Sequence, residues 1–142
     1  MEVKTTECGA FRYDDSTIIH FPEGMLGFVH FKKFVLLELE ETRPLRWLQS
    51  VEEPSLAFPV LDPSTIFPNY DCTPSSADLL SLQIENPADM LTLAVAIIPE
   101  DPARTTVNLK APVLINYKRM LGKQVVLTDT SSDVWTPLVE QA

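Results

Sequence analysis

Twelve prolines are spread along the 142 residues, and they limit what this chain can fold into. Proline lacks a backbone N–H, and its ring blocks the interior of a helix, so it tends to end an element or to sit at its edge. The intervals between the prolines leave little room for long helices. The chain is therefore expected to fold from short elements joined by many turns.

The segments between these breaks have the composition of β-strands. Val, Ile, Leu and Phe dominate most of them, and Pro, Gly, Asp or Asn stands at their ends, which is typical of strands bounded by turns. Strands are predicted at 16–20, 33–40, 45–50, 56–61, 91–98, 107–109, 112–117 and 123–128.

Two hairpins are predicted between these strands. The sequence YKRMLGK joins the last two, and its Gly122 is available for a positive φ near the turn. The sequence VEEP, at 51–54, joins the third strand to the fourth, and Pro54 suits a turn because its φ is fixed.

One segment breaks the strand pattern. PSSADLLSLQI offers Ser75 or Ser76 as a helix N-cap and Asp78 in the first turn, so one short helix is predicted there. Short strands with one helix indicate an all-β, mainly antiparallel fold, either a small barrel or a sandwich. The length and the absence of a linker predict a single domain over 1–142.

Charge narrows the classes of partner. The chain has 20 acidic and 11 basic residues, a net charge of −9, so a phosphate backbone would be repelled and direct nucleic-acid binding is not expected. A basic protein partner would be attracted by the same field, chiefly in its rate of association.

Location is predicted from what the sequence lacks. No apolar run approaches the ~20 residues that span a bilayer. The start MEVKTTECGAF lacks the basic then apolar order of a signal peptide. We expect a cytoplasmic protein without membrane contact, whose Cys8 and Cys72 are reduced thiols.

The stretch FPEGMLGF, at 21–28, raises the question of a phosphate-binding loop. Its two glycines are not followed by Lys-Ser/Thr or by a helix start, as a phosphate loop requires. We interpret it as a structural turn built on Pro22, Gly24 and Gly27, with Gly24 in a conformation that other residues avoid. Phe21 and Phe28 are expected to anchor this turn in the core.

Little in the sequence indicates catalysis or a metal site. His20 and His30 are the candidates for acid–base chemistry near neutral pH, and a Cys–His enzyme using Cys8 or Cys72 stays an alternative, because such residues meet only in the fold. The close Cys and His pairs of a zinc site are missing, so no metal or cofactor is expected. A β-barrel module that binds a small ligand is a further alternative.

Exposed aromatic residues are candidates for partner binding, since aromatics dominate interface hot spots. Trp47 and Tyr70 are such candidates, although each of them is more often a core residue. Near the C-terminus, Trp135 and Leu138 either pack back or are offered to another chain.

Taken together, the motifs resemble the bacterial flagellar assembly factor FliW. The resemblance is carried in order by FPEGMLGF at 21–28, FVLLELEE at 34–41, WLQSVEEPSLAFPVLDP at 47–63, FPNYD at 67–71 and NLKAPVLINYKRMLGKQVVL at 108–127. It implies a small β-barrel-like fold without catalytic activity.

The resemblance also implies two protein partners. Members of the family bind flagellin, the filament subunit, and CsrA, a dimeric translational repressor. When flagellin leaves the cell, the freed factor captures the repressor, and flagellin synthesis resumes. The motifs themselves look like core, so the expected contacts are exposed acidic and aromatic loop positions, namely Glu52, Glu53, Tyr70, Asp71, Glu100 and Asp101.

Overall fold

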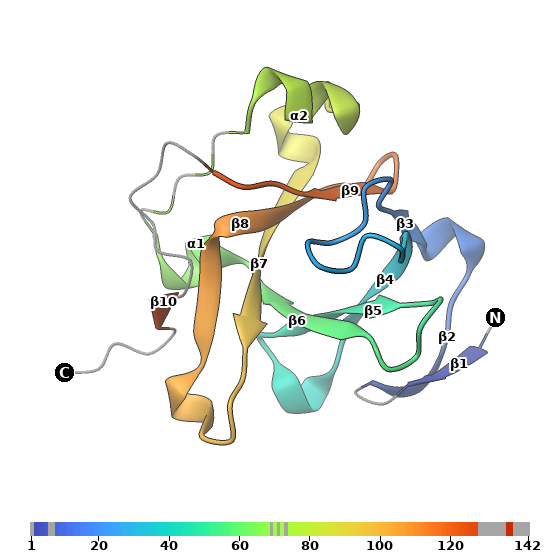
Figure 1. Ribbon diagram of the computed structural model, residues 1–142, viewed down its shortest axis with the longest axis vertical. Coiled ribbons are helices and arrows are strands. Elements are labelled where there is room, and N and C mark those ends of the chain that lie inside the picture. The colour runs from blue at the N-terminus through green and yellow to red at the C-terminus, as the bar shows by residue number, and fades with distance from the viewer. Residues whose placement is uncertain are drawn as a thin grey trace.

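The computed structural model describes residues 2–5, 8–68, 70, 72, 74–127 and 136–137, and Figure 1 shows them arranged as a small barrel of strands. The strands are β1 (Glu2–Thr5), β2 (Gly9–Arg12), β3 (Ile19–His20), β4 (Lys33–Glu38), β5 (Arg46–Ser50), β6 (Ala57–Leu61), β7 (Met90–Ile97), β8 (Thr106–Asn116), β9 (Leu121–Gln124) and β10 (Thr136–Pro137). The helices are α1 (Pro63–Ile66) and α2 (Ser76–Ser81), with 3-10 turns η1 (Asp15–Thr17), η2 (Glu40–Thr42), η3 (Pro87–Asp89) and η4 (Pro102–Arg104).

Seven of these strands, β3 to β9, close on themselves. They pair in the order β8-β7-β6-β5-β4-β3-β9, and β9 pairs again with β8 to complete the ring. Every pair is antiparallel except β3 with β9, which run parallel where His20 faces Leu121. Closure removes most open strand edges. The predicted all-β, mainly antiparallel, barrel-like fold is confirmed.

The interior of the barrel is filled with side chains. Phe21, Phe34, Leu48, Leu93 and Val113 are fully buried in one cluster, to which most of the barrel strands contribute. A second cluster, around Leu61, Ala94 and Val107, lies where α1 and the segment after it cover β7 and β8. A third cluster joins Leu82 at the end of α2 to Leu114 and Val125.

Both predicted hairpins are confirmed, since β5 pairs with β6 and β8 with β9 in antiparallel register. The positive φ, however, was assigned to the wrong residue of the second turn. Met120 has φ +53, whereas Gly122 lies within β9. A Cβ on Gly122 would lie 2.6 Å from two ring atoms of Phe21, so this glycine makes room for a core ring and not for a turn.

The two strands predicted at 107–109 and 112–117 are one strand, β8. Its pairing with β7 shifts register, because Val95 faces Asn108 while Leu93 faces Val113. The Asn108 carboxamide oxygen accepts hydrogen bonds from the backbone N–H of Lys110 and Ala111, at 3.1 and 3.0 Å, and so stabilises the bend. Pro112 stands in this irregular part, which is where a sheet tolerates proline.

Other predicted boundaries need correction as well. The strand predicted at 16–20 is the short β3 preceded by η1, and that predicted at 33–40 ends at Glu38, before η2. The strands β1, β2 and β10 were not predicted. The strand predicted at 123–128 is β9, which begins earlier, at Leu121, and already ends at Gln124; residue 128 lies outside the described ranges.

The predicted short helix is α2, and Ser75 is its N-cap, accepting a hydrogen bond from the Asp78 N–H at 3.1 Å. The helix α1 was missed. It begins with Pro63 after Asp62, whose side chain accepts from the Ser64 N–H at 2.9 Å. Proline suits the first turn of a helix, where no intrahelical N–H is needed, so Pro63 begins a helix here instead of ending an element.

Candidate partner-binding surfaces

The loop between β3 and β4 contains FPEGMLGF and has a tightly built base. Phe21 is fully buried and meets the Phe34 ring edge to face, with centroids 5.3 Å apart. Gly24 has φ +68, and its N–H donates to the Phe21 carbonyl at 2.9 Å. A Cβ on Gly24 would lie 2.6 Å from the Val29 Cα, so this position combines the expected positive φ with a close approach of backbone.

The second half of the same loop is a tight turn. Met25 and Phe28 form an isolated bridge, with Gly27 at φ +83 between them, and open space surrounds the place where a Gly27 Cβ would stand. Pro22 is exposed, and its carbonyl accepts from the Lys32 ammonium at 3.0 Å. The three turn residues therefore differ, because only Gly24 has both a restricted φ and crowded surroundings.

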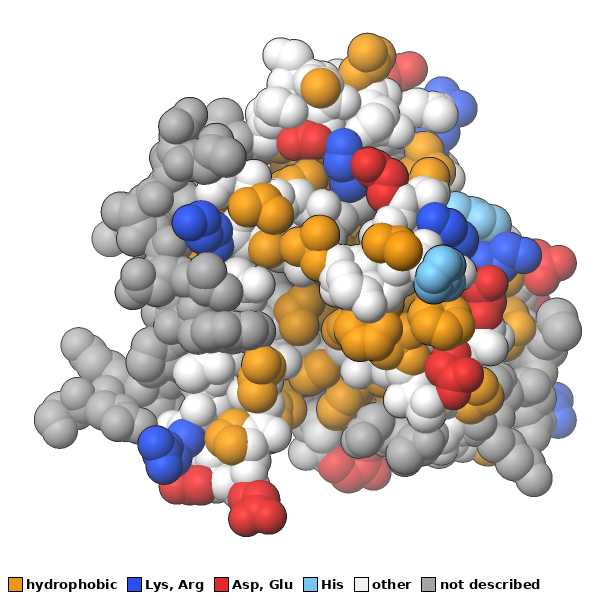
Figure 2. Space-filling model, in the orientation of Figure 1, with side chains coloured by type: hydrophobic (Ala, Val, Ile, Leu, Met, Phe, Trp, Pro, Cys, Tyr) orange, Lys and Arg blue, Asp and Glu red, His pale blue; other side chains and the backbone are white. Residues whose placement is uncertain are grey.

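The outer side of this loop is apolar. Leu26, Phe28 and Val29 are exposed, Phe28 by 39%. This exposure corrects the expectation that Phe28 is a core residue. Its ring still packs on that of Phe58 in an edge-to-face arrangement, with the ring centroids 5.4 Å apart. Figure 2 shows hydrophobic side chains gathered on the face that carries the loop, with histidine beside them.

A charged cluster ties the loop to α2 and β9. The Lys123 ammonium lies 2.8 Å from Asp78, 3.3 Å from Glu23 and 3.4 Å from the Ser81 hydroxyl. The hydrogen bond to Asp78 outweighs burial and raises the pKa of Lys123. Burial alone would raise the pKa of Asp78, but the bonds from Lys123 and Ser75 prevail and hold that pKa below its ordinary value.

Sequence reasoning missed this cluster. Asp78 was noted only as a first-turn carboxylate and Glu23 only as part of a turn. No spacing in the sequence links them to Lys123, because the three belong to three different elements that the barrel brings together.

Glu52 and Glu53, expected at a partner interface, brace the β5–β6 turn. The Glu52 carboxylate accepts from the N–H groups of Lys32 and Lys33, at 2.6 and 2.9 Å. That of Glu53 accepts from the Ser55 hydroxyl at 2.5 Å. Both carboxylates therefore help to hold the β5–β6 turn in its conformation.

The other expected contact residues lie in two further places. The Tyr70 hydroxyl donates to the Leu109 carbonyl at 2.6 Å, and its ring packs against the second core cluster. Asp71 lies outside the described residues, as do Trp135 and Leu138. Glu100 and Asp101 stand exposed in the β7–β8 loop, where Asp101 caps η4 by accepting from the Ala103 N–H at 3.1 Å.

The residues named for catalysis lie in described parts of the chain. His20 and His30 are exposed near the β3–β4 loop, Cys72 packs at the edge of the third core cluster, and Cys8 is half-buried. Among the described residues, no three His, Cys, Asp or Glu side chains are grouped so as to hold a metal ion.

The alternative of a small-ligand module requires an apolar cavity, and the described residues line two surface clefts. One, of about 370 Å³, lies between residues 12–17 and the outer face of β4. The other, of about 530 Å³, is lined by Thr42, Trp47, Ser55, Ala57, Pro59, Ala96, Ile97 and Ile98 and is called here the β6–β7 cleft.

In the part of the chain described, no helix is both long and apolar enough to cross a membrane.

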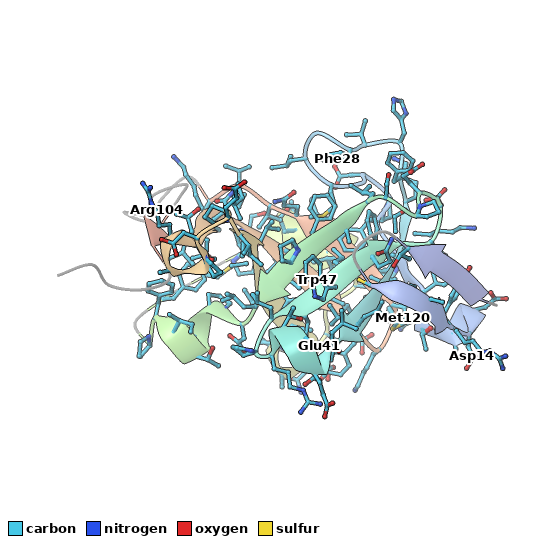
Figure 3. The ribbon with its side chains drawn as sticks, turned by 90° about the horizontal axis from the view of Figure 1, so that it is seen from below. Asp14, Phe28, Glu41, Trp47, Arg104 and Met120 are labelled. Carbon is cyan, nitrogen blue, oxygen red and sulfur yellow. The ribbon has the colours of Figure 1, made fainter. Side chains whose placement is uncertain are left out.

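The β6–β7 cleft brings together loops that carry several of the expected contact residues. Figure 3, seen from below, shows Trp47 close to the η2 turn with Glu41, and Arg104 on the β7–β8 hairpin. The Trp47 indole N–H donates to the Thr42 hydroxyl at 3.0 Å, so the ring is held in place. The Glu53 carboxylate accepts a hydrogen bond from the lining residue Ser55, and Glu100 follows the lining residue Ile98 by two positions in the chain.

Comparison with known proteins places the chain in a family. The model of the FliW protein family matches residues 2–138. The flagellar assembly factor FliW of Leptospira interrogans serovar Lai is 38% identical over 143 residues, with 100% of this chain and 95% of that protein covered. That of Geobacter sulfurreducens is 39% identical over 142 residues, with 100% and 89% covered.

A solved structure agrees with these sequence relatives. It is described as the crystal structure of the flagellar assembly factor FliW, and it matches this fold with a TM-score of 0.94 at 34% identity, covering 99% of each chain. The relatives are thus named for assembly and not for a reaction. The chain belongs to the FliW family of flagellar assembly factors.

Proposed function

We propose that this flagellar assembly factor works by binding two proteins in turn, flagellin and the translational repressor CsrA. While flagellin is abundant in the cytoplasm, it occupies the factor. When flagellin is exported, the free factor binds the repressor and removes it from the flagellin messenger. The action is partner exchange and needs neither catalysis nor a cofactor.

Family membership over nearly the whole chain carries this proposal. The match covers residues 2–138, and the fold agrees with a solved FliW structure over 99% of the chain. The net charge of −9 supports it from a second side, because an acidic protein beside an RNA-binding repressor repels the RNA and attracts the repressor's basic surface.

The antagonist role is tested by a gel-shift titration. Labelled messenger RNA is held in complex with the repressor, and the factor is added in increasing amounts. The RNA is expected to be released, while the factor alone shifts no RNA. A slower-migrating complex that contains all three components at every concentration would contradict the proposal.

A further inference from the structure

The strands β6 and β7 separate at one end, and the separation creates the β6–β7 cleft. They pair only at Val60 with Val95 and at Leu61 with Ala94, although β6 begins at Ala57 and β7 extends to Ile97. Pro59 has no N–H to donate, so the ladder cannot continue in the usual way past it.

The separated strands leave backbone groups facing the cleft. Leu56 accepts from the Ser50 N–H at 2.9 Å, so the alternation of an antiparallel strand turns Phe58 and Val60 toward β5 and turns Ala57 toward β7. Ala57 lies beyond the last residue pair of β6 with β7, so its N–H and C=O have no ladder partner there. Continued by one residue, the register of Val60 with Val95 would place Ala96 opposite Pro59, which has no N–H to offer the Ala96 carbonyl.

The walls of the cleft are apolar, and some are well exposed. Ile97 is exposed by 49% and Ile98 by 38%, beside the mostly buried Trp47 and the small side chains of Ala57 and Ala96. Exposed Ile side chains next to unused strand positions are what an added extended segment would cover.

Three acidic residues that neighbour the lining residues, Glu41, Glu53 and Glu100, are taken here as the acidic rim of the cleft. Glu41 precedes the lining residue Thr42, Glu53 is bonded to the lining residue Ser55, and Glu100 follows the β7 wall. The basic neighbours of the lining are Arg104 of η4, Arg46, and Arg43, which pairs with Glu38 at 2.8 Å. The whole chain carries −9. A second copy of this chain would bring the same acidic rim and the same net charge, which disfavours self-pairing here.

We propose that the β6–β7 cleft receives an extended segment of a partner protein that has β-branched or other apolar side chains at its centre and Lys or Arg at its ends. The segment pairs with backbone groups of Ala57 and Ala96, which lie beyond the β6–β7 residue pairs, its apolar side chains pack on Trp47 and the two isoleucines, and its basic ends meet the acidic rim. The proposal concerns the surface, so it is independent of whether flagellin or the repressor binds this factor.

The test selects binders without assuming their identity. A displayed library of random dodecamer peptides is panned against the full chain in a Trp135→Phe background, which leaves Trp47 as the one tryptophan of the two. Enriched peptides are expected to have an apolar centre with basic ends, to shift the fluorescence of Trp47, and to slow hydrogen exchange at the Ala57 amide.

Two exposed apolar positions provide the matched variants. Ile98→Asp places a charge in the cleft wall, whereas Val126→Asp makes the same kind of change at an exposed residue outside the lining. With melting temperatures matched, Ile98→Asp is expected to weaken peptide binding at least tenfold and Val126→Asp less than twofold.

Three results would overturn the proposal. The first is a selection that enriches no sequence over a counter-selection against Ile98→Asp. The second is a set of enriched peptides that bind Ile98→Asp as tightly as the parent. The third is a concentration-dependent dimer that Ile98→Asp dissociates, which would make a second copy the occupant.

Discussion

Gly24 shows how one residue determines the course of the β3–β4 loop. Its φ of +68 and the 2.6 Å approach of the Val29 Cα to a hypothetical Cβ are two separate obstacles to any side chain. Gly27, at φ +83 with open space around it, presents only the first. Comparing substitutions at the two glycines therefore separates the cost of backbone strain from the cost of steric collision.

Gly24→Val is expected to destabilise the fold more than Gly27→Val. A positive φ costs a side chain about 1–2 kcal/mol, and the backbone collision at Gly24 adds to that cost. Thermal melts should rank the parent, Gly27→Val and Gly24→Val in decreasing order, with Glu23→Gln close to the parent.

Binding titrations on the same variants decide between architecture and contact. Gly24→Val should weaken every partner in parallel, through lost stability. A Gly24→Val protein that melts like the parent yet loses one partner only would identify the loop as a binding surface.

Gly122 and Phe21 form a pair that can be tested by a double-mutant cycle. Gly122→Ala is expected to cost about 1–3 kcal/mol or more, the range of overpacked core substitutions, because the new methyl group would collide with the fully buried Phe21 ring. Phe21→Leu is also destabilising, but it makes room for the new methyl group. The double variant should therefore lose less free energy of unfolding than the sum of the two, and strict additivity would contradict the contact.

These residues also show how far sequence reasoning reaches at this scale. Gly24 was predicted to have a special conformation because a glycine after Pro-Glu is a local signal. The role of Gly122 was not predictable in that way, since its constraint comes from Phe21, a residue remote in the chain. The same limit explains Glu52, whose bonds to Lys32 and Lys33 were invisible before the strands were placed.

At the scale of elements, the Lys123 cluster joins α2 to the barrel. Lys123→Met should lower the free energy of unfolding by about 1 kcal/mol and increase hydrogen exchange in α2, since this pair is less exposed than an ordinary surface pair. Arg43→Met, which breaks the exposed pair with Glu38, serves as the control and should cost less than about 0.5 kcal/mol.

The stabilisation by this cluster depends on pH, and the direction follows from the pKa shifts of Asp78 and Lys123. The lowered pKa of Asp78 gives stability that is present above the ordinary value of 3.8 and is lost as pH falls through the folded value. The raised pKa of Lys123 gives stability present below 10.5 and lost as pH rises through its folded value. Urea melts should show a constant difference between parent and Lys123→Met between these limits and a shrinking one at lower pH; a difference that grows on acidification would contradict the assignment.

Element prediction succeeded where local signals were strong. It failed at β8, which was divided because Asn108 and Pro112 are turn signals that here stabilise a bend within one strand. The small pairings of β1 with β2 and of β10 with β8 depend on neighbours and left no distinct pattern.

At the scale of the whole molecule, the charge of −9 predicts how the factor meets a basic partner. The association rate with the repressor should fall as salt rises, because long-range attraction is screened beyond roughly 8 Å at physiological ionic strength, while the dissociation rate changes little. Stopped-flow rates that stay constant from low to high salt would remove electrostatics from the encounter.

The choice of charge variant follows from the structure. Glu100→Lys is the suitable reversal, because Glu100 is exposed, whereas Glu52→Lys would break the bonds that brace the β5–β6 turn.

The family was recognisable from ordered motifs along the chain, but those motifs are largely core and turn. Hence the sequence predicted the fold and the family, and it did not predict the β6–β7 cleft.

Partner exchange is the central claim, and one titration tests it most directly. Labelled messenger RNA is mixed with the repressor, the factor is added until RNA anisotropy falls, and flagellin monomer is then added in excess, with flagellin alone as the control. The exchange account predicts that anisotropy rises again as flagellin takes the factor and the repressor returns to the RNA. Anisotropy that stays low with flagellin in excess would contradict exchange and show that the two partners bind independently.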